Sequence, residues 1–574
     1  MNEARRWTMR SEAWLGGRRG PVFLVLSAAL LGFAWSIRFV QDDAFISFLY
    51  AKQMVSGHGL TWFGTYVEGY TNFLWVLWIA VGLQLGVDPV TWAHLGSMAS
   101  FAAALSAVWR MAHLLTGSQG SALLAVLMFG TNYTVASYAT GGLETMLQTA
   151  VVSWAAVGAL ALFRPNRESL RSLLALSLLL TAAVLTRLDS VVLGFWIGVT
   201  VLWALFRRGA GWPLFASFLL PLALILGGWL AWKFQYYGSV LPNTFAAKVG
   251  WDRSTIENGL LYLARFFHWY LIWPVLLVGG IAGLIGFRRG RLADASRRVW
   301  LLVPPILTWF AYVVVVGGDF MEFRFFVPVS PFLFVLLAAL VHGGFGGAVG
   351  RPALCSAIAL SLLVVASGRH ATRFSGTSED KTLDSIPALS TFYGHYPEGR
   401  WDRIGNRLRE GLTDRGTVIA VHAVGAIPYY SGLDTVDMWG LNDPWIARHG
   451  EPAPAAYRRP GHRRHATLKY LRERGVNFVI GEPTRIERGE LTRMDQPAVF
   501  GFWLQTVISF NRVPIEKATL VAMPLDGNEA LLMWYLTPTA EIDRAIAEGG
   551  WERKDMRRRL RPDVARGRPR DAPS

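Results

Sequence analysis

The stretch Gln41-Asp42-Asp43-Ala44-Phe45-Ile46-Ser47 decides how the rest of this sequence is interpreted. It follows an apolar run, residues 21–39, that is about long enough to cross a bilayer. Two adjacent carboxylates therefore stand where the first helix should leave the membrane. Reduced hydration there raises the pKa of a carboxyl group unless cations or hydrogen bonds compensate. We expect a function for at least one of the two aspartates; the alternative is a simple helix cap.

The composition is that of a polytopic membrane protein. Of the 574 residues, 52% are hydrophobic and only 17% are charged, and several apolar runs reach spanning length. The net charge of +16 comes from arginines in loops and from a basic tail, residues 551–574, so we do not expect nucleic-acid binding. The single cysteine, Cys355, excludes an intramolecular disulfide and a cysteine-based zinc site.

Arginine placement orients the predicted spans. Residues 1–20 form a basic N-terminus, which we place in the cytoplasm ahead of an uncleaved signal anchor. The apolar segment 72–86 is only about 15 residues long, and counting it as a span would put two arginine-bearing hairpins outside. We therefore assign it to the interface. About eleven transmembrane helices then remain, near 21–39, 95–115, 121–138, 144–163, 170–186, 190–206, 213–234, 271–287, 299–316, 326–342 and 352–368.

This topology divides the chain into a membrane part and a soluble part. Residues 21–368 form the transmembrane domain, with a large outer loop at 40–94. Residues 369–550 have more charge and proline, and they alternate predicted strands, Thr417–His422 and 476–480, with a helix at 466–474. We predict a soluble extracytoplasmic α/β domain there, followed by the disordered tail 551–574.

The outer segments carry the side chains that could do chemistry. In the loop 40–94, Glu68, Tyr70 and Asn72 offer hydrogen bonds and an aromatic face of the kind that binds sugars, although a turn-rich loop would have a similar composition. Glutamate, aspartate and arginine at helix ends can also be plain capping pairs. Cations in such loops could grip a phosphate. The further candidates are Glu144, Arg187, Asp189, Asn243, Lys248, Asp319 and Arg324.

Together these stretches resemble the GT-C superfamily of glycosyltransferases that use polyprenyl-phosphate sugars. The likeness is greatest to the mycobacterial terminal β-(1→2)-arabinofuranosyltransferases. It rests on residues 42–46, 67–72, 142–144, 186–189, 242–244 with 247–248, and 317–321 with Arg324. Where that family often has Arg-Pro, this chain has Arg187-Leu188, so the sugar stays open.

The resemblance implies transfer of a sugar, with arabinofuranose as a candidate, from a polyprenyl-phosphate donor to an envelope glycan or glycolipid outside the bacterial cell membrane. Asp43 or Asp42 would be the general base. Arg324 and Lys248 would hold the leaving phosphate. The remaining candidates would bind or position the substrates, namely Glu68, Tyr70, Asn72, Glu144, Arg187, Asp189, Asn243 and Asp319. Superfamily members differ in metal use, so a divalent metal cofactor is left open.

Two other functions are compatible with a polytopic envelope protein. A transporter or flippase for a lipid-linked saccharide would place charges near the bilayer midplane and break helices there. A non-enzymatic assembly protein would use residues 369–574 as a docking module. Because the charges in this sequence cluster at the outer ends of the predicted helices, we favour the enzyme.

Overall fold

The computed structural model describes residues 20–556 except 165–166, 249, 251, 289–300, 346–359, 362–363, 373–382, 391–399, 414, 454–461, 495–497, 500 and 502–517. The described chain forms two compact units. Unit 1 comprises residues 20–60 and 70–390, and unit 2 comprises residues 61–69, 400–453 and 462–556. The predicted basic N-terminus, most of the last predicted span and most of the basic tail lie outside the described residues.

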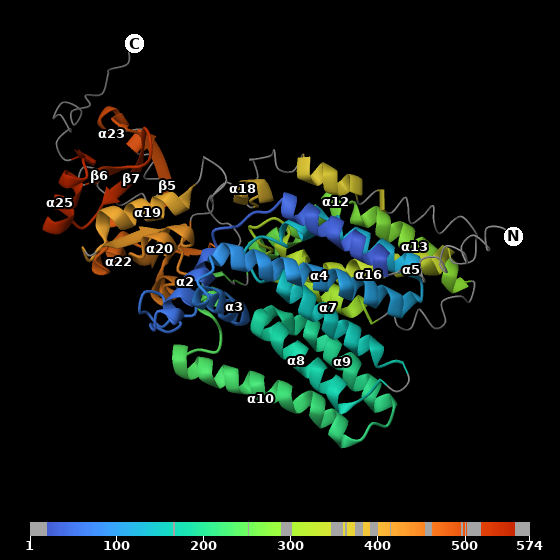
Figure 1. Ribbon diagram of the computed structural model, residues 1–574. Helices are drawn as coiled ribbons and strands as arrows, with labels where there is room; N and C mark the ends of the chain where they lie inside the picture. Colours follow the sequence, from blue (N-terminus) through green and yellow to red (C-terminus); the bar gives the residue numbers. More distant parts are fainter. Residues whose placement is uncertain are drawn as a thin grey trace, which may run out of the picture. The chain divides into compact units, whose positions relative to one another are not determined.

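Unit 1 is a bundle of apolar helices (Figure 1). Helix α4 packs against α5, α7 and α16, while α8 packs against α7 and α10. After a first helix, Gly20–Ser36, the helices are α2 (Ala44–Val55), α3 (Phe73–Gln84), α4 (Pro89–Thr116), α5 (Gln119–Gly130), α6 (Tyr133–Ser137), α7 (Thr145–Ala161), α8 (Leu170–Thr186), η1 (Leu188–Ser190), α9 (Val191–Arg207), α10 (Trp212–Tyr237), α11 (Asn243–Lys248), α12 (Arg253–Trp269), α13 (Ile272–Arg288), α15 (Val303–Val315), η2 (Arg324–Phe326), α16 (Ser330–Phe345) and α18 (Ile386–Ser390).

The helices follow most of the predicted spans, but their number as spans is not confirmed. Within the described residues, three helices are long and apolar enough to cross a membrane: Pro89–Thr116, Leu188–Arg207 and Trp212–Tyr237. The predicted span 121–138 is divided into α5 and α6. The cause is Asn132, whose side chain accepts a hydrogen bond from Val135 N (3.1 Å) and so caps a new helix.

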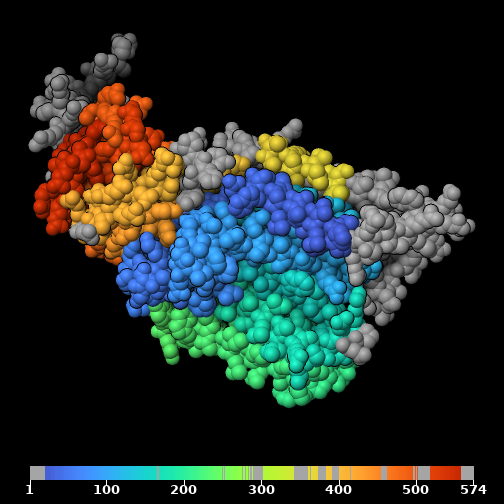
Figure 2. Space-filling model, in the orientation of Figure 1, coloured from blue at the N-terminus to red at the C-terminus, as the bar shows by residue number. Residues whose placement is uncertain are grey.

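The apolar helices α3 and α10 of unit 1 differ in length. Helix α3 has 12 residues, so it is about 18 Å long and too short to cross a bilayer. The interfacial assignment of segment 72–86 stays a prediction, because other apolar helices of unit 1, such as Gln119–Gly130, are as short. Helix α10 is long and apolar, and its side chains lie mostly exposed along one edge of unit 1, in green in Figure 2. Such a helix is suited to a lipid environment.

Unit 2 is built on a six-stranded mixed sheet with the order β2-β1-β5-β7-β6-β8. Strand β1 pairs in parallel with β2 and β5, and the other pairs are antiparallel. The elements are α19 (Trp401–Leu412), β1 (Val418–Val421), α20 (Ala426–Ser431), β2 (Asp434–Asp437), α21 (Pro444–His449), β3 (Glu451–Pro452), β4 (Arg464–His465), α22 (Leu468–Glu473), β5 (Phe478–Glu487), α23 (Glu490–Arg493), β6 (Thr519–Pro524), β7 (Glu529–Tyr535), α25 (Ala540–Glu548) and β8 (Glu552–Asp555). The predicted strands 417–422 and 476–480 and the predicted helix 466–474 are confirmed as β1, β5 and α22.

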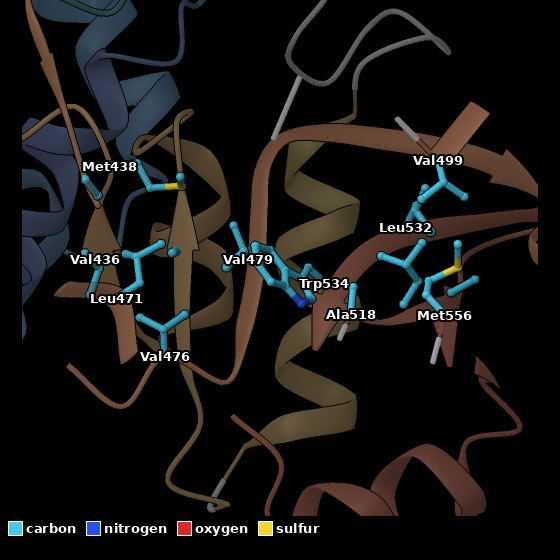
Figure 3. Close-up of a cluster of buried hydrophobic side chains, with 14 of the residues drawn as sticks. Val436, Met438, Leu471, Val476, Val479, Val499, Ala518, Leu532, Trp534 and Met556 are labelled. Atoms are coloured by element: carbon cyan, nitrogen blue, oxygen red, sulfur yellow. The ribbon is translucent and has the colours of Figure 1, made fainter. Parts of the chain in front are cut away.

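Alternation along the strands gives unit 2 its core. Leu532 and Trp534, two residues apart on β7, lie on the same face of the sheet as Val479 and Val436 (Figure 3). All four are 2% exposed or less. A short piece of the loop 40–94 also belongs to this unit: residues 61–69, where Trp62 Nε1 donates to Thr435 O (2.8 Å).

Candidate active site

The aspartate pair follows the first helix, Gly20–Ser36, and lies at the start of α2. Asp43 occupies the N-cap position, but its side chain makes no capping hydrogen bond. Both Asp42 and Asp43 are partly buried, whereas residues Ala44 to Ala51 of the same helix are fully buried. The Asp43 carboxylate is therefore not used to satisfy the helix end, which was the structural alternative for that residue.

A tight glycine turn brings Glu144 close to α2. Gly142 has φ = +81°, and a Cβ atom there would lie 2.8 Å from Cβ of Ala44. Only glycine fits both the backbone conformation and this close approach. The turn is held from the other side by Trp75, whose Nε1 donates to Gly142 O (3.1 Å). Glu144 follows at the N-cap of α7 and is 1% exposed.

Arg187 is fully occupied by two carboxylates. Its Nη1 donates to Glu144 Oε1 (2.7 Å), while Nε and Nη2 donate to Asp189 Oδ2 (3.1 and 2.8 Å). Gln148 Nε2 donates to Asp189 Oδ1 (2.8 Å), and Asn72 Nδ2 donates to Glu144 Oε2 (2.6 Å). Because every nitrogen of this guanidinium already has a partner, Arg187 fixes the position of its neighbours.

Arg324 is held differently. Its Nε donates to Asp319 Oδ2 (2.7 Å), and within the described part of the chain its two terminal nitrogens make no hydrogen bond. Gly318, at φ = +73°, passes so close to α12 that a Cβ atom would meet Tyr262 at 2.8 Å. Phe323 precedes Arg324 in the left-handed conformation (φ = +46°), which is strained for a non-glycine residue. The backbone of this segment is thus constrained directly before each member of the Asp319–Arg324 pair.

Lys248 interacts electrostatically with Asp43 and with Arg324. Desolvation raises the pKa of the Asp43 carboxyl, and Lys248 and then Arg324 are the cations that oppose this increase most strongly. Desolvation likewise lowers the pKa of the Lys248 ammonium, and Asp43 is the charge that counteracts it most. The charges of residues 43, 248 and 324, a carboxylate and two cations, therefore interact within unit 1.

The other predicted residues are divided between the two units, and all but Glu68 lie in unit 1. Asn72, Glu144, Arg187, Asp189 and Asp319 belong to the charged network of unit 1. Tyr70 is buried in the same unit, and its hydroxyl lies 3.1 Å from that of Tyr237. Asn243 is buried at the start of α11, and Glu68 is buried in unit 2. Among the described residues, no group of three or more His, Cys, Asp or Glu side chains could hold a metal ion.

A second buried polar chain was not predicted. Glu322 and His370 are each 1% exposed, and Glu322 Oε1 lies 3.1 Å from His370 Nε2. His370 Nδ1 lies 2.9 Å from the hydroxyl of Tyr270, and Ile386 N donates to Glu322 Oε2 (2.8 Å). Desolvation raises the pKa of Glu322 to about 8. The glutamate in the segment 317–324 was the available signal, but its partners are about 50 residues or more away in sequence.

The comparisons with known proteins agree with this architecture. The crystal structure of ArnT from Cupriavidus metallidurans in the apo state matches 91% of this chain and 99% of its own, with 14% identity and a TM-score of 0.52. ArnT bound to undecaprenyl phosphate matches 90% of this chain and 98% of its own, with the same identity and TM-score. The R1389S mutant of arabinofuranosyltransferase AftD from Mycobacteria matches 91% of this chain and 42% of its own, with 14% identity and a TM-score of 0.50.

A family model described as a domain of unknown function, DUF8728, matches residues 392–520, whose described residues fall in unit 2. None of the curated proteins matches the sequence. The likeness to these structures supports the predicted fold of the chain. At 14% identity this likeness establishes the fold of the chain alone.

Proposed function

We propose that this chain is a membrane glycosyltransferase that transfers a sugar from a polyprenyl-phosphate donor to an acceptor hydroxyl. The observation that carries the proposal is the grouping of Asp43 with Lys248 and Arg324, a carboxylate with two cations. Glycosyl transfer from a lipid phosphate needs this set of groups: a base for the acceptor and positive charge for the leaving phosphate.

In the proposed reaction, Asp43 takes the proton of the acceptor hydroxyl as its oxygen bonds to the anomeric carbon of the sugar. The bond between that carbon and the phosphate oxygen breaks, and its electron pair leaves with polyprenyl phosphate. Arg324 and Lys248 stabilise the negative charge that develops there. Asp43 is the better candidate for the base than Asp42, because the two cations act on its carboxyl and its side chain does not cap α2.

The two arginines of the site have separate tasks in this proposal. Arg324 uses one nitrogen for Asp319, so its terminal nitrogens can grip phosphate oxygens as a fork. Arg187 is saturated by Glu144 and Asp189 and positions the network. Both guanidinium groups lie over the ring of Phe325, with distances to its centroid of 5.4 Å from Arg324 and 5.6 Å from Arg187.

The location of the charges favours an enzyme over a flippase. Asp43 and Glu144 stand at helix N-caps, Arg187 stands at the C-terminal end of α8, and Lys248 ends α11. None of these lies in the middle of a long apolar helix, where a transporter would need its coupling charges.

The finer identity of the substrates is also a proposal. Likeness in fold to the AftD mutant and the sequence motifs support arabinofuranose as the first sugar to test, with an envelope glycan or glycolipid as acceptor. We place the reaction on the outer face of the bacterial cell membrane, with residues 369–550 outside as well.

The experiment is a transfer assay on the purified full-length protein in lipid nanodiscs. It uses a panel of polyprenyl-phosphoryl pentoses and hexoses and measures release of polyprenyl phosphate in the presence of envelope glycan fragments. We expect one donor to be used, and Asp43→Asn to abolish most of the release. Absence of release with every donor, from protein that is folded by its melting temperature, would refute the proposal.

A further inference from the structure

Two side chains beside the charged network are buried without hydrogen-bond partners. Gln41 and Tyr138 are each 1% exposed. Within the described residues, the amide oxygen and nitrogen of Gln41 and the hydroxyl of Tyr138 make no hydrogen bond. The hydroxyls of Ser137 and Thr145 share this property, so five such atoms fall in two short segments, residue 41 and residues 137–145. Buried polar atoms are normally satisfied, and each exception calls for an explanation.

Gln41 and Tyr138 both lie against one glycine, Gly141. Gln41 N donates to Gly141 O (3.4 Å), and a Cβ atom on Gly141 would lie 3.4 Å from the ring of Tyr138. The Tyr138 ring also packs edge-on against Phe39, with 5.8 Å between centroids. These contacts fix the ring while leaving its hydroxyl without a partner among the described residues.

Both residues border the groups assigned to the reaction. Gln41 is two residues from Asp43, the proposed base. Arg324, Glu322 and Asp319 are the charged side chains that act most strongly on the Tyr138 hydroxyl, so this hydroxyl is near the cation assigned to the leaving phosphate. During transfer the sugar ring must lie between the acceptor oxygen and that phosphate, because the acceptor oxygen attacks the anomeric carbon as the bond from this carbon to the phosphate breaks.

We propose that Gln41 and Tyr138 form a hydrogen-bonding subsite for the hydroxyl groups of the donor's sugar ring and help to select the sugar. The chemistry is complementary: a carboxamide offers two donors and an acceptor, a phenol offers one of each, and a sugar hydroxyl can both donate and accept. This inference rests on the proposed function of the site. It adds the two residues that would recognise the sugar as distinct from the phosphate and the lipid.

The unpartnered hydroxyl makes Tyr138→Phe a clean test. Removing a buried polar atom that has no protein partner should not lower the stability of the ligand-free protein. Tyr270→Phe is the matched control, because the Tyr270 hydroxyl accepts from Thr134 N (2.9 Å) and lies 2.9 Å from His370 Nδ1. We expect the melting temperature to fall in Tyr270→Phe and to stay unchanged or rise in Tyr138→Phe. A clear fall in Tyr138→Phe would assign its hydroxyl a structural role.

Binding is then measured with two probes on the full-length protein in nanodiscs. One probe is polyprenyl phosphate, and the other is the polyprenyl-phosphoryl monosaccharide that the wild type binds most tightly in the panel. Tyr138→Phe and Gln41→Leu should bind polyprenyl phosphate as the wild type does. They should bind the glycosylated probe about 3- to 10-fold more weakly for each hydrogen bond lost, and the ranking of sugars in the panel should flatten.

The outcomes separate this inference from the proposed function. If the wild type binds the glycosylated probe and both variants bind it equally well, the subsite is refuted while the glycosyltransferase proposal stands. Equal weakening toward both probes in Tyr138→Phe would also overturn the subsite, since it would place the hydroxyl on the phosphate. If the wild type binds neither probe, the proposed function fails and the subsite fails with it.

Discussion

Replacing Arg324 by lysine separates the charge of this residue from its shape. Lysine can keep a positive charge opposite Asp319, but one ammonium group cannot present two parallel donors to a phosphate. In the wild type, the Arg324 Nε is committed to Asp319 Oδ2 at 2.7 Å, and the terminal nitrogens are those assigned to the donor. Arg324→Lys should therefore leave the fold intact and impair transfer.

The magnitude follows from the number of contacts that are lost. One charge-assisted hydrogen bond is worth about 1.5–3 kcal/mol, so kcat/KM should fall about 10- to 150-fold. Arg324→Ala would be a poorer test, because it leaves Asp319, 5% exposed, without its partner and should cost about 3–5 kcal/mol of stability. The double variant Arg324→Ala/Asp319→Asn removes both charges and avoids that penalty.

The assay compares initial rates of polyprenyl phosphate release with melting temperatures for the same preparations. Arg187→Lys serves as the control, because all three nitrogens of Arg187 are already bound by Glu144 and Asp189. Arg187→Lys should lower the melting temperature, and its activity should fall only in proportion to the fraction of protein that remains folded. Wild-type kcat/KM in Arg324→Lys would refute the phosphate fork, as would a loss of activity that only follows the folded fraction.

Four further outcomes are expected. Asp43→Asn, measured beside Asp42→Asn, should slow transfer by about 10²-fold or more at unchanged melting temperature, and the reverse order of effects would exchange the two roles. Desolvation raises the pKa of Asp43 from its ordinary value of 3.8 and lowers that of Lys248 from 10.5. On the acid side kcat/KM should therefore fall, as Asp43 is protonated, at a pH above 3.8, and on the alkaline side it should fall, as Lys248 loses its proton, at a pH below 10.5. A flat profile between these two pH values would contradict both roles. Because the folded pKa of Glu322, about 8, is raised above the unfolded value of 4.5, its contribution to stability is complete below pH 4.5 and is lost as the pH rises through 8; Glu322→Gln should remove this dependence and gain a few kcal/mol at pH 8, measured by thermal unfolding across pH. A reporter fused after Gly368 should be active only if it folds outside the cytoplasm, and cytoplasmic activity would also overturn the interfacial assignment of 72–86.

The sequence predicted the fold class because hydropathy is a strong, local signal. Most helices of unit 1 fall within a few residues of the apolar runs, and the short segments 417–422 and 476–480 correctly predicted strands β1 and β5 of unit 2. The break between α5 and α6 was missed, because an asparagine within an apolar run gives no sign that it will cap a new helix until its partner, Val135 N, is placed. The number of spans depends on lengths that local hydropathy does not determine.

The candidate site was predictable in its members and not in its connections. Short motifs at the ends of apolar runs identified Asp43, Glu144, Arg187 and Arg324 one at a time. Arg187 has a partner for every nitrogen because Glu144, 43 residues away in sequence, packs against it, whereas Arg324 contacts Asp319, only five residues away. Which arginine keeps nitrogens for a substrate therefore depends on how the helices pack. Gln41 and Tyr138 are still harder to identify, since their distinguishing feature is a partner that the rest of the described chain does not supply.

The proposed chemistry also explains why a carboxylate stands beside the two cations instead of being kept away from them. Before transfer, Lys248 and Arg324 are near one negative charge on Asp43 and one on the donor phosphodiester. After transfer, Asp43 holds the acceptor's proton and is neutral, while polyprenyl phosphate carries two negative charges. The local total is unchanged, so the reaction moves charge past fixed cations without creating any in a poorly solvated site. It follows that Asp43→Asn, which removes the first charge, should bind the donor at least as tightly as the wild type even though transfer is slow. Weaker donor binding in that variant would mean that Asp43 holds the substrate and does not act as its base.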